Sequence, residues 1–122
     1  MNNLTTEIIL DTTTVGTPSG NYDGSTDHFV SDPVEAVAYY LGRGSIQTVT
    51  INVTGFEGII TIQGTLGEIA EESAWSDVYQ FDSASSVVTD YHPEAILGNF
   101  TWMRAVVTQF NAGTIDFVRI TF

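Results

Sequence analysis

The stretch GNFTWMRAVVTQFNAGTIDFVRITF, residues 98–122, decides the class of fold. Val118, Ile120 and Phe122 alternate with polar or charged residues, and apolar residues near the start of the stretch alternate in the same way. Alternation with a period of two is typical of β-strands that bury one face. The sequence NAG at 111–113 has the composition of a turn. The stretch therefore predicts two strands that form one wall of a β-sandwich.

The middle of the chain repeats this pattern. Val49, Ile51 and Val53 alternate with Thr and Asn, and a second strand is expected at 59–66. The two glycines at 54–58 between these strands predict a hairpin. Further strands are expected at 5–12, 33–41, 75–81 and 87–88. Seven or eight short strands favour an all-β fold, namely an antiparallel β-sandwich of jelly-roll type.

The chain is expected to form one domain, because 122 residues suffice for a core without metal or disulfide support. Residues 1–38 are expected to form an N-terminal strand and a polar arm or loop, and residues 39–122 the body of the sandwich. The arm is placed at 13–31, which is rich in Gly, Ser and Asp. Long polar loops of this kind are often functional. The segment 33–41 also permits one or two helical turns, but its neighbours favour a strand.

The charge of the chain excludes several classes of partner. Three Arg, no Lys and 15 carboxylates give a formal net charge of -12. Nucleic-acid binding depends on Lys and Arg, and anionic membranes repel acidic surfaces, so we expect neither partner. The charge serves solubility, or it marks the outer surface of a particle or a protein from a saline environment. The absence of Cys excludes disulfides and thiolate chemistry.

The beginning of the chain does not resemble a targeting signal. Residues 1–14 lack the basic region and the long apolar region of a signal peptide. The chain has no apolar stretch of the length that a membrane span requires. We therefore expect a soluble protein that is made in a cytoplasm.

Few residues indicate catalytic or metal chemistry. The segment NYDGSTD at 21–27 offers oxygen donors for Ca²⁺, but it lacks the EF-hand spacing, and a surface turn rich in Asn and Asp is the preferred interpretation. His28 and His92 lack the spacing of a catalytic triad or of a helical metal site. Nothing sets the separation of the carboxylates at 68–77, which glycoside hydrolysis would need. We predict no catalytic residue, metal site or cofactor, and no enzymatic activity.

The tryptophans and arginines leave two interpretations open. Trp75 and Trp102 are both expected in the core, Trp102 more strongly, because large aromatic side chains in strands are usually buried. If Trp75 is instead exposed, Trp75 and Asp77 would form a platform for stacking a glycan. Arg104 and Arg119 are expected in neighbouring strands, where they would pair with nearby carboxylates.

Several segments follow one another in a recognisable order. They are YYLG at 39–42, IQTV at 46–49, FEGIITIQGTL at 56–66, Trp75, GNFTWMRA at 98–105 and GTI at 113–115. In this order, residues 39–122 resemble the small virion structural proteins of tailed phages, especially phages of cyanobacteria and other marine bacteria. The likeness departs at Trp75, where an aromatic DWF sequence is expected and AWSD is found. This departure leaves the position on the particle open.

The resemblance implies a non-enzymatic component of the virion. A capsid decoration or cement protein that binds the particle through loops and the N-terminal arm is the favoured function. A neck, tail or fibre component with a carbohydrate-binding role in host attachment is the alternative. The expected partners are the major capsid protein or neck and tail proteins, and a homo-oligomer is also open. Tyr22, Phe29 and Tyr91 are expected to anchor the interface, because they are aromatic residues in polar loops.

Overall fold

The computed structural model describes residues 5–38, 46–67 and 74–122. Its elements are β1 (Thr6–Leu10), β2 (Thr13–Thr14), β3 (Phe29–Val30), β4 (Val34–Glu35), β5 (Ile46–Thr65), β6 (Ser76–Asp82), β7 (Val88–Leu97) and β8 (Trp102–Thr121). They form one eight-stranded sheet in which every pairing is antiparallel. The predicted all-β, antiparallel, sandwich-like fold is confirmed. In the described ranges, no helix is long and apolar enough to span a membrane.

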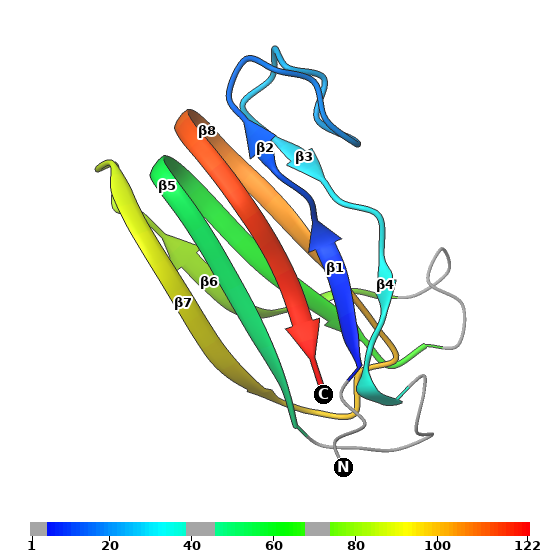
Figure 1. Ribbon diagram of the computed structural model, residues 1–122. Coiled ribbons are helices and arrows are strands. Elements are labelled where there is room, and N and C mark those ends of the chain that lie inside the picture. Colours follow the sequence, from blue (N-terminus) through cyan, green and yellow to red (C-terminus); the bar gives the residue numbers. More distant parts are fainter. Residues whose placement is uncertain (1–4, 39–45, 68–73) are drawn as a thin grey trace.

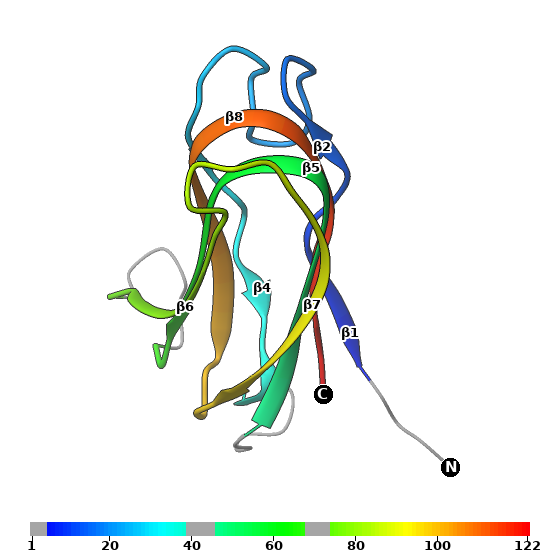
Figure 2. The same ribbon diagram turned by 90° about the vertical axis from the view of Figure 1, so that its left-hand side faces the viewer.

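Two long strands, β5 and β8, form the centre of the sheet. Each has 20 residues, and the two pair along almost their whole length. They bend together near their middles, so that the sheet folds over onto itself (Figures 1 and 2). Layer one contains β1, residues 114–121 of β8, residues 46–53 of β5, and β7. Layer two contains β3, β4, residues 102–108 of β8, residues 59–65 of β5, and β6.

Glycines make the shared bend possible. Gly55 and Gly113 have positive φ angles of 58° and 85°, in the left-handed region that favours glycine. A Cβ atom on Gly113 would collide with the backbone of Gly55 and would lie 2.7 Å from the backbone nitrogen of Phe56. The pairing register shifts on both sides of Glu57, as at β-bulges. The predicted hairpin at 54–58 and turn at 111–113 are therefore wrong, because both segments continue their strands through the bend.

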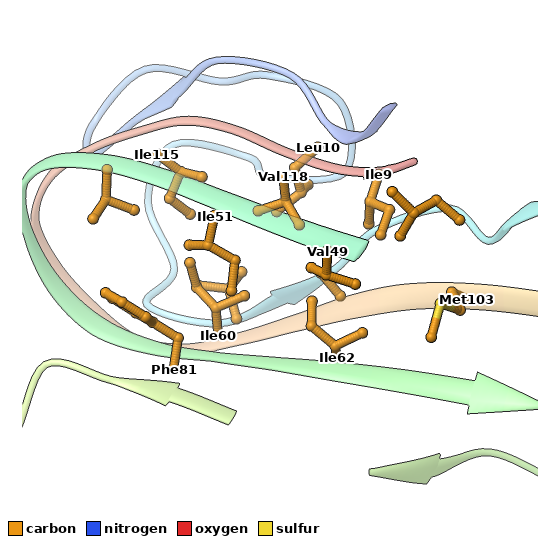
Figure 3. Close-up of a cluster of buried hydrophobic side chains, with 14 of the residues drawn as sticks. Ile9, Leu10, Val49, Ile51, Ile60, Ile62, Phe81, Met103, Ile115 and Val118 are labelled. Carbon is orange, nitrogen blue, oxygen red and sulfur yellow. The ribbon is translucent and has the colours of Figure 1, made fainter. Parts of the chain in front are cut away.

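The core lies between the two layers (Figure 3). Val49, Ile51 and Val53 of layer one are fully buried, as are Ile60 and Ile62 of layer two. The second half of β8 contributes Ile115, Val118 and Ile120, and the first half contributes Met103, Ala105 and Val107. The alternation predicted from the sequence is confirmed in these strands, because each buried residue is followed by one on the outer side.

The N-terminal segment is part of the sheet and does not form a separate arm. Strands β1 to β4 all pair with β8. Tyr22 and Phe29 are only 1% and 7% exposed, and their ring centroids lie 5.1 Å apart. Tyr22 also packs on Phe110 at 5.3 Å and accepts a 2.9 Å hydrogen bond from the backbone N–H of Gly16. The segment predicted as a polar arm thus carries aromatic side chains that close the top of the core.

Candidate functional site

We call the outer side of layer one the layer-one face. Its members are the residues that alternate with the buried residues of β1, β5, β7 and β8. They are Thr6, Ile8, Ile46, Thr48, Thr50, Asn52, Tyr91, Pro93, Ala95, Leu97, Phe117, Arg119 and Thr121. The strand register places them in rows across four strands, so they act as one surface.

Carboxylates are sparse on the layer-one face, because Asp116 is the one carboxylate that the strand register places on this outer side among the residues that the structure describes. This is unusual in a chain with 15 carboxylates and a net charge of -12. On β7, Asp90 and Glu94 are paired with the inward-facing Val53 and Val49, so they point away from this face. Asp116 lies in a bulge beside the outward-facing Phe117, and its carboxylate accepts a 2.6 Å hydrogen bond from the outward-facing Thr54 at the end of the face near the bend. Arg119 and Asp116 are therefore the described charges on the face, and no described ion pair joins them.

The same face gathers exposed apolar side chains. Four of the eight large hydrophobic residues exposed in the described ranges belong to it. They are Ile8 (44% exposed), Ile46 (56%), Tyr91 (56%) and Leu97 (72%). Contiguous exposed apolar surface often marks a site of interaction with another molecule. This apolar face, with a single described carboxylate near one end, is the strongest candidate for an interaction surface on this molecule.

Tyr91, Phe117 and Arg119 form a defined cluster on the layer-one face. The Arg119 guanidinium lies over the Phe117 ring, with Cζ 4.5 Å from the ring centroid. Its Nη2 donates a hydrogen bond to the Tyr91 hydroxyl at 3.1 Å. The Tyr91 and Phe117 rings meet edge to face, with centroids 6.2 Å apart. The aromatic rings hold the guanidinium in one orientation, because both stacking and hydrogen bonding restrict it.

A second cluster lies on the outer side of layer two. The Arg104 guanidinium lies over the Trp75 ring at 4.3 Å and donates a 2.8 Å hydrogen bond from Nε to the Gln63 side chain. Gln63 in turn donates a 2.8 Å hydrogen bond to Asp77. Trp75 is half-buried, and Trp102 faces outward because Met103 occupies the inward position beside it. The prediction that both tryptophans lie in the core is wrong.

The arginines differ from their predicted roles. Within the described ranges, neither Arg104 nor Arg119 forms an ion pair with a carboxylate. Each is instead held by an aromatic ring and by one neutral hydrogen-bond acceptor. Arg104 reaches Asp77 only through Gln63. The predicted direct pairs fail because the strand register places other side chains next to each arginine.

The cluster closest to a catalytic arrangement lies between the edges of β6 and β7. The Tyr79 hydroxyl lies 2.8 Å from His92 Nε2, which lies 3.1 Å from the Glu94 carboxylate. The two rings stack with centroids 5.7 Å apart. Burial, followed by the negative charges of Glu94 and Asp90, raises the pKa of Tyr79. A raised pKa disfavours the phenolate, so Tyr79 is not an activated nucleophile.

The position of this cluster at the edges of β6 and β7 gives its residues a structural role. Inward-pointing charged and polar side chains on edge strands discourage pairing with another sheet. Asp90, His92 and Glu94 occupy three successive inward positions on β7. Pro93 lies between them and cannot donate a backbone hydrogen bond. The arrangement protects the edges of β6 and β7 while it closes that side of the core.

The segment at 21–27 is a turn that its own side chains stabilise. Asp23 accepts hydrogen bonds from the backbone N–H groups of Ser25 at 2.8 Å and Thr26 at 3.0 Å. These two bonds lower the pKa of Asp23. No group of three potential metal ligands occurs in the part of the chain that the structure describes. The preferred sequence interpretation, a turn rich in Asn and Asp, matches this geometry.

A cleft of about 240 Å³ lies between β1 and the segment 31–34. Asn21 is at its edge and donates to the Val30 carbonyl at 2.9 Å and to the Asp32 carboxylate at 3.0 Å. Ser19 donates to the Thr12 carbonyl at 3.1 Å. Several polar groups around the cleft are thus already engaged, and the cleft is small for a ligand-binding pocket.

The predicted site residues fall in three different places. Tyr22 and Phe29 are core residues whose rings pack on Phe110. Because they are buried, they cannot anchor an interface as the sequence suggested. Tyr91 is exposed on the layer-one face. Trp75 and Asp77 meet at the second cluster, on the outer side of layer two. The predicted carboxylates at 68–73 and the YYLG segment lie outside the described residues.

Comparison with known proteins gives no match to a family model, to a curated protein or to a solved structure. The function is therefore inferred from the sequence and the geometry of this chain. Sequence reasoning missed Ile8, Leu97 and Phe117 as surface residues, and it missed the contact of Arg119 with Tyr91. The signal that could have found part of this surface is the alternation at 90–94, where the polar residues Asp90, His92 and Glu94 occupy every second position.

Proposed function

We propose that the protein is a non-enzymatic virion structural protein of a tailed phage, most directly a capsid decoration or cement protein. The order of segments from residue 39 to residue 122 supports the phage origin. The layer-one face supports the assembly role, because it combines four exposed apolar side chains with a single described carboxylate, Asp116, which Thr54 binds. In this proposal the protein docks on a larger protein of the particle through the layer-one face.

The charge distribution suits this role. A net charge of -12 keeps free copies apart in solution. Burying an unpaired carboxylate in an interface is strongly unfavourable. The layer-one face carries one described carboxylate, Asp116, which already accepts a hydrogen bond from Thr54, so the face can be covered with little of that penalty. Many copies that each bury a modest area would then stabilise an assembly by mass action.

A non-enzymatic role agrees with the chemistry of the polar cluster on β6 and β7. Tyr79, His92 and Glu94 have the spacing of hydrogen-bonded partners, but the raised pKa of Tyr79 opposes nucleophilic use. The same residues have a sufficient structural role in protecting sheet edges.

Size-exclusion chromatography with light scattering tests the proposal. The purified protein is run alone and with the candidate major capsid protein. We expect co-elution with capsid assemblies, and we expect Leu97→Asp to weaken it because that change places a carboxylate on the face. Val87→Asp is the matched control, since Val87 is similarly exposed (61% against 72%) but precedes β7 and lies outside the face.

Two results would count against the decoration role. Equal binding by wild type and Leu97→Asp would remove the layer-one face from the interaction. A wild-type protein that ignores capsid assemblies and forms a discrete oligomer would instead point to the neck, tail or fibre.

A glycan-binding role is a second candidate, favoured by the outer side of layer two. Trp75, Gln63 and Asp77 combine an aromatic ring with polar groups, as a sugar-stacking platform requires. Arg104 already covers one side of the Trp75 ring. In a Trp102→Phe variant, the fluorescence of Trp75 should change on addition of host-surface glycans if this role is correct. An unchanged spectrum would exclude Trp75 as the platform.

A further inference from the structure

We infer that the free edge of β1 binds an extended segment of another protein as an added antiparallel strand. In that segment a basic residue stands between two apolar residues, and the three residues pair with Thr6, Glu7 and Ile8. The inference concerns a strand edge beside the layer-one face. It rests on the proposed function only in assigning the segment to a protein of the particle.

Strand β1 lies at one end of layer one. It pairs with β8 and with no other strand in the part of the chain that the structure describes. Strand β4, on the same side of the molecule, belongs to layer two (Figure 2), and no backbone hydrogen bond between described residues joins it to β1. The place beside β1 within layer one is therefore open to a further strand, as far as the described elements are concerned.

Thr6 and Ile8 direct their backbone groups toward this open edge. Thr5 and Phe122 exchange two backbone hydrogen bonds of 2.8 and 2.9 Å. Hydrogen-bonded and non-hydrogen-bonded residues alternate along an antiparallel pair, so Glu7 faces β8 as Thr5 does. Thr6 and Ile8 face away from β8, and the register shift after Ile8 ends the regular pairing. Two N–H donors and two C=O acceptors thus point to the open edge.

The two sides of the sandwich differ in how their edges are protected. Strand β7 carries Pro93 and has Asp90 and Glu94 on its inward side, which discourages pairing with another chain. Strand β1, with the sequence TEIIL, has no proline and one charged residue, Glu7. An edge with unpaired backbone groups is a template for strand addition. The fold therefore favours strand addition at β1.

The inward side of this edge favours a basic residue. Directly paired residues of neighbouring strands point to the same face of a sheet. Glu7 is paired with the buried Ile120, so it belongs to the inward side of β1. The cleft between β1 and the segment 31–34 is lined by Asp11 and Asp32, which add two carboxylates nearby. A basic residue opposite Glu7 would complement these charges.

The outer side of the same edge favours apolar residues. Ile8 is 44% exposed and is paired with Arg119 on β8. A basic residue opposite Ile8 would approach this guanidinium, whereas an apolar residue would cover the Ile8 side chain. The added strand would thereby extend the apolar layer-one face by one strand.

A second copy of β1 meets these requirements poorly. The register that pairs Thr6 with Ile8 of the other copy uses all four backbone groups, but it also places Glu7 opposite Glu7. Like charges directly opposite each other destabilise a strand pair. The net charge of -12 on each copy adds repulsion at longer range. These terms favour a strand from a different protein.

The experiment uses the full chain, labelled for NMR, and three synthetic peptides with blocked ends. Thr-Val-Arg-Val-Thr is the test peptide. Thr-Pro-Arg-Pro-Thr keeps its charge but lacks two backbone N–H donors, and Thr-Val-Glu-Val-Thr keeps the donors but reverses the charge. We expect the test peptide to shift the amide signals of Thr6 and Ile8 and to slow their hydrogen exchange. The two control peptides should bind at least about tenfold more weakly.

Two variants test the edge from the side of the protein. Thr6→Pro removes one outward-facing donor at the first position of the strand, where proline is tolerated and no bond to β8 is lost. Thr6→Ala is the matched control, because it keeps the backbone N–H. We expect Thr6→Pro to weaken binding of the test peptide by about fivefold or more, and Thr6→Ala to stay within about twofold of wild type. Circular dichroism of each variant verifies that the fold is retained.

The outcomes separate this inference from the proposed function. Equal binding of the test peptide and Thr-Pro-Arg-Pro-Thr, or of Thr6→Pro and Thr6→Ala to the test peptide, would refute the edge site. If the protein binds the test peptide but ignores assembled candidate major capsid protein, the docking function falls and the edge site stands. If Leu97→Asp weakens capsid binding but the test peptide does not bind, docking stands and the edge site falls. A dimer in analytical ultracentrifugation that Thr6→Pro dissociates would overturn the assignment to a different protein.

Discussion

The bend shared by β5 and β8 creates the two-layered molecule, and Gly113 is the position where it is most sensitive to change. Gly113 has a φ of 85°, and a Cβ atom there would overlap the backbone of Gly55. Because the colliding atoms belong to the backbone of the neighbouring strand, no side-chain rotation relieves the overlap. We predict that Gly113→Ala destabilises the protein by opening the bend.

Two contributions make up the expected loss. A left-handed conformation costs a non-glycine residue about 1–2 kcal/mol. Forcing an extra methyl group into a packed site costs about 1–3 kcal/mol more. Alanine also lowers the entropy of the unfolded chain, which offsets about 0.4–1 kcal/mol. We therefore expect Gly113→Ala to lower the free energy of unfolding by about 3 kcal/mol.

Gly16 provides a matched control for the conformational contribution. Its φ of 86° is nearly identical, but a Cβ atom there would meet nothing within 4 Å. Gly16→Ala should therefore cost only about 1 kcal/mol, from conformation alone. Urea unfolding followed by circular dichroism measures both variants. The reasoning about the bend is refuted if the two substitutions cost the same within about 0.5 kcal/mol, the usual scatter of surface changes.

Three further predictions follow from the core and the polar cluster. Because the pKa of Tyr79 is raised, the folded state keeps the phenol proton above pH 10. The contribution of this group to the free energy of unfolding is therefore fully present below the unfolded pKa and is lost as pH rises through the folded pKa. Tyr79→Phe should remove a component of the tyrosine absorbance titration that lies above the usual tyrosine pKa, and an unchanged titration curve would contradict the assignment. Phe110→Ala should lower the free energy of unfolding in urea by about 3–5 kcal/mol because the ring is buried. Tyr91→Ala should lower it by less than about 1 kcal/mol because that side chain is exposed. Similar losses for both variants would refute the two placements. Deletion of residues 13–31 should unfold the protein, because it removes Tyr22 and Phe29 from the core. The dispersion of amide signals in an NMR spectrum measures this loss. A folded deletion variant would support the interpretation of this segment as an arm.

The strand faces could be predicted from the sequence because their signal is local. Val49, Ile51 and Val53 alternate with polar residues, and that alternation alone identifies the buried side of the strand. The same reasoning succeeded for Val118 and Ile120. It requires no knowledge of which strands are neighbours.

The bend could not be distinguished from a hairpin. Gly55 and Gly58 permit a tight turn, and they equally permit a bulge inside a continuous strand. The choice depends on the partner strand, since β8 bends at the opposite position and keeps its pairing with β5. No local pattern within residues 54–58 carries that information.

The polar composition of 13–31 also misled the prediction for its aromatic residues. Tyr22 and Phe29 lie among Gly, Ser and Asp, which favours exposure on composition alone. Their burial depends on Phe110, which is more than 80 positions from either residue along the chain. Contacts of this kind arise from the folded arrangement of β8.

The candidate site was the least predictable part of the molecule. Strand β7 has the polar residues Asp90, His92 and Glu94 on its inward side and exposed Tyr91 and Leu97 on its outer side, the reverse of the usual pattern. Its sequence therefore does not indicate a strand with a buried apolar face. The layer-one face also joins residues from four strands, and only the register brings Tyr91 next to Arg119. Tyr91 was expected as an interface residue, but its cluster could not be.

The most direct measurement of the central claim is site-specific photo-crosslinking to the particle. A photoreactive phenylalanine derivative replaces Tyr91 on the layer-one face in one variant and Trp75 on the outer side of layer two in the other. After incubation with assembled candidate major capsid protein, irradiation should join the first variant to the capsid protein and leave the second free. Crosslinking from position 75 without crosslinking from position 91 would contradict docking through the layer-one face.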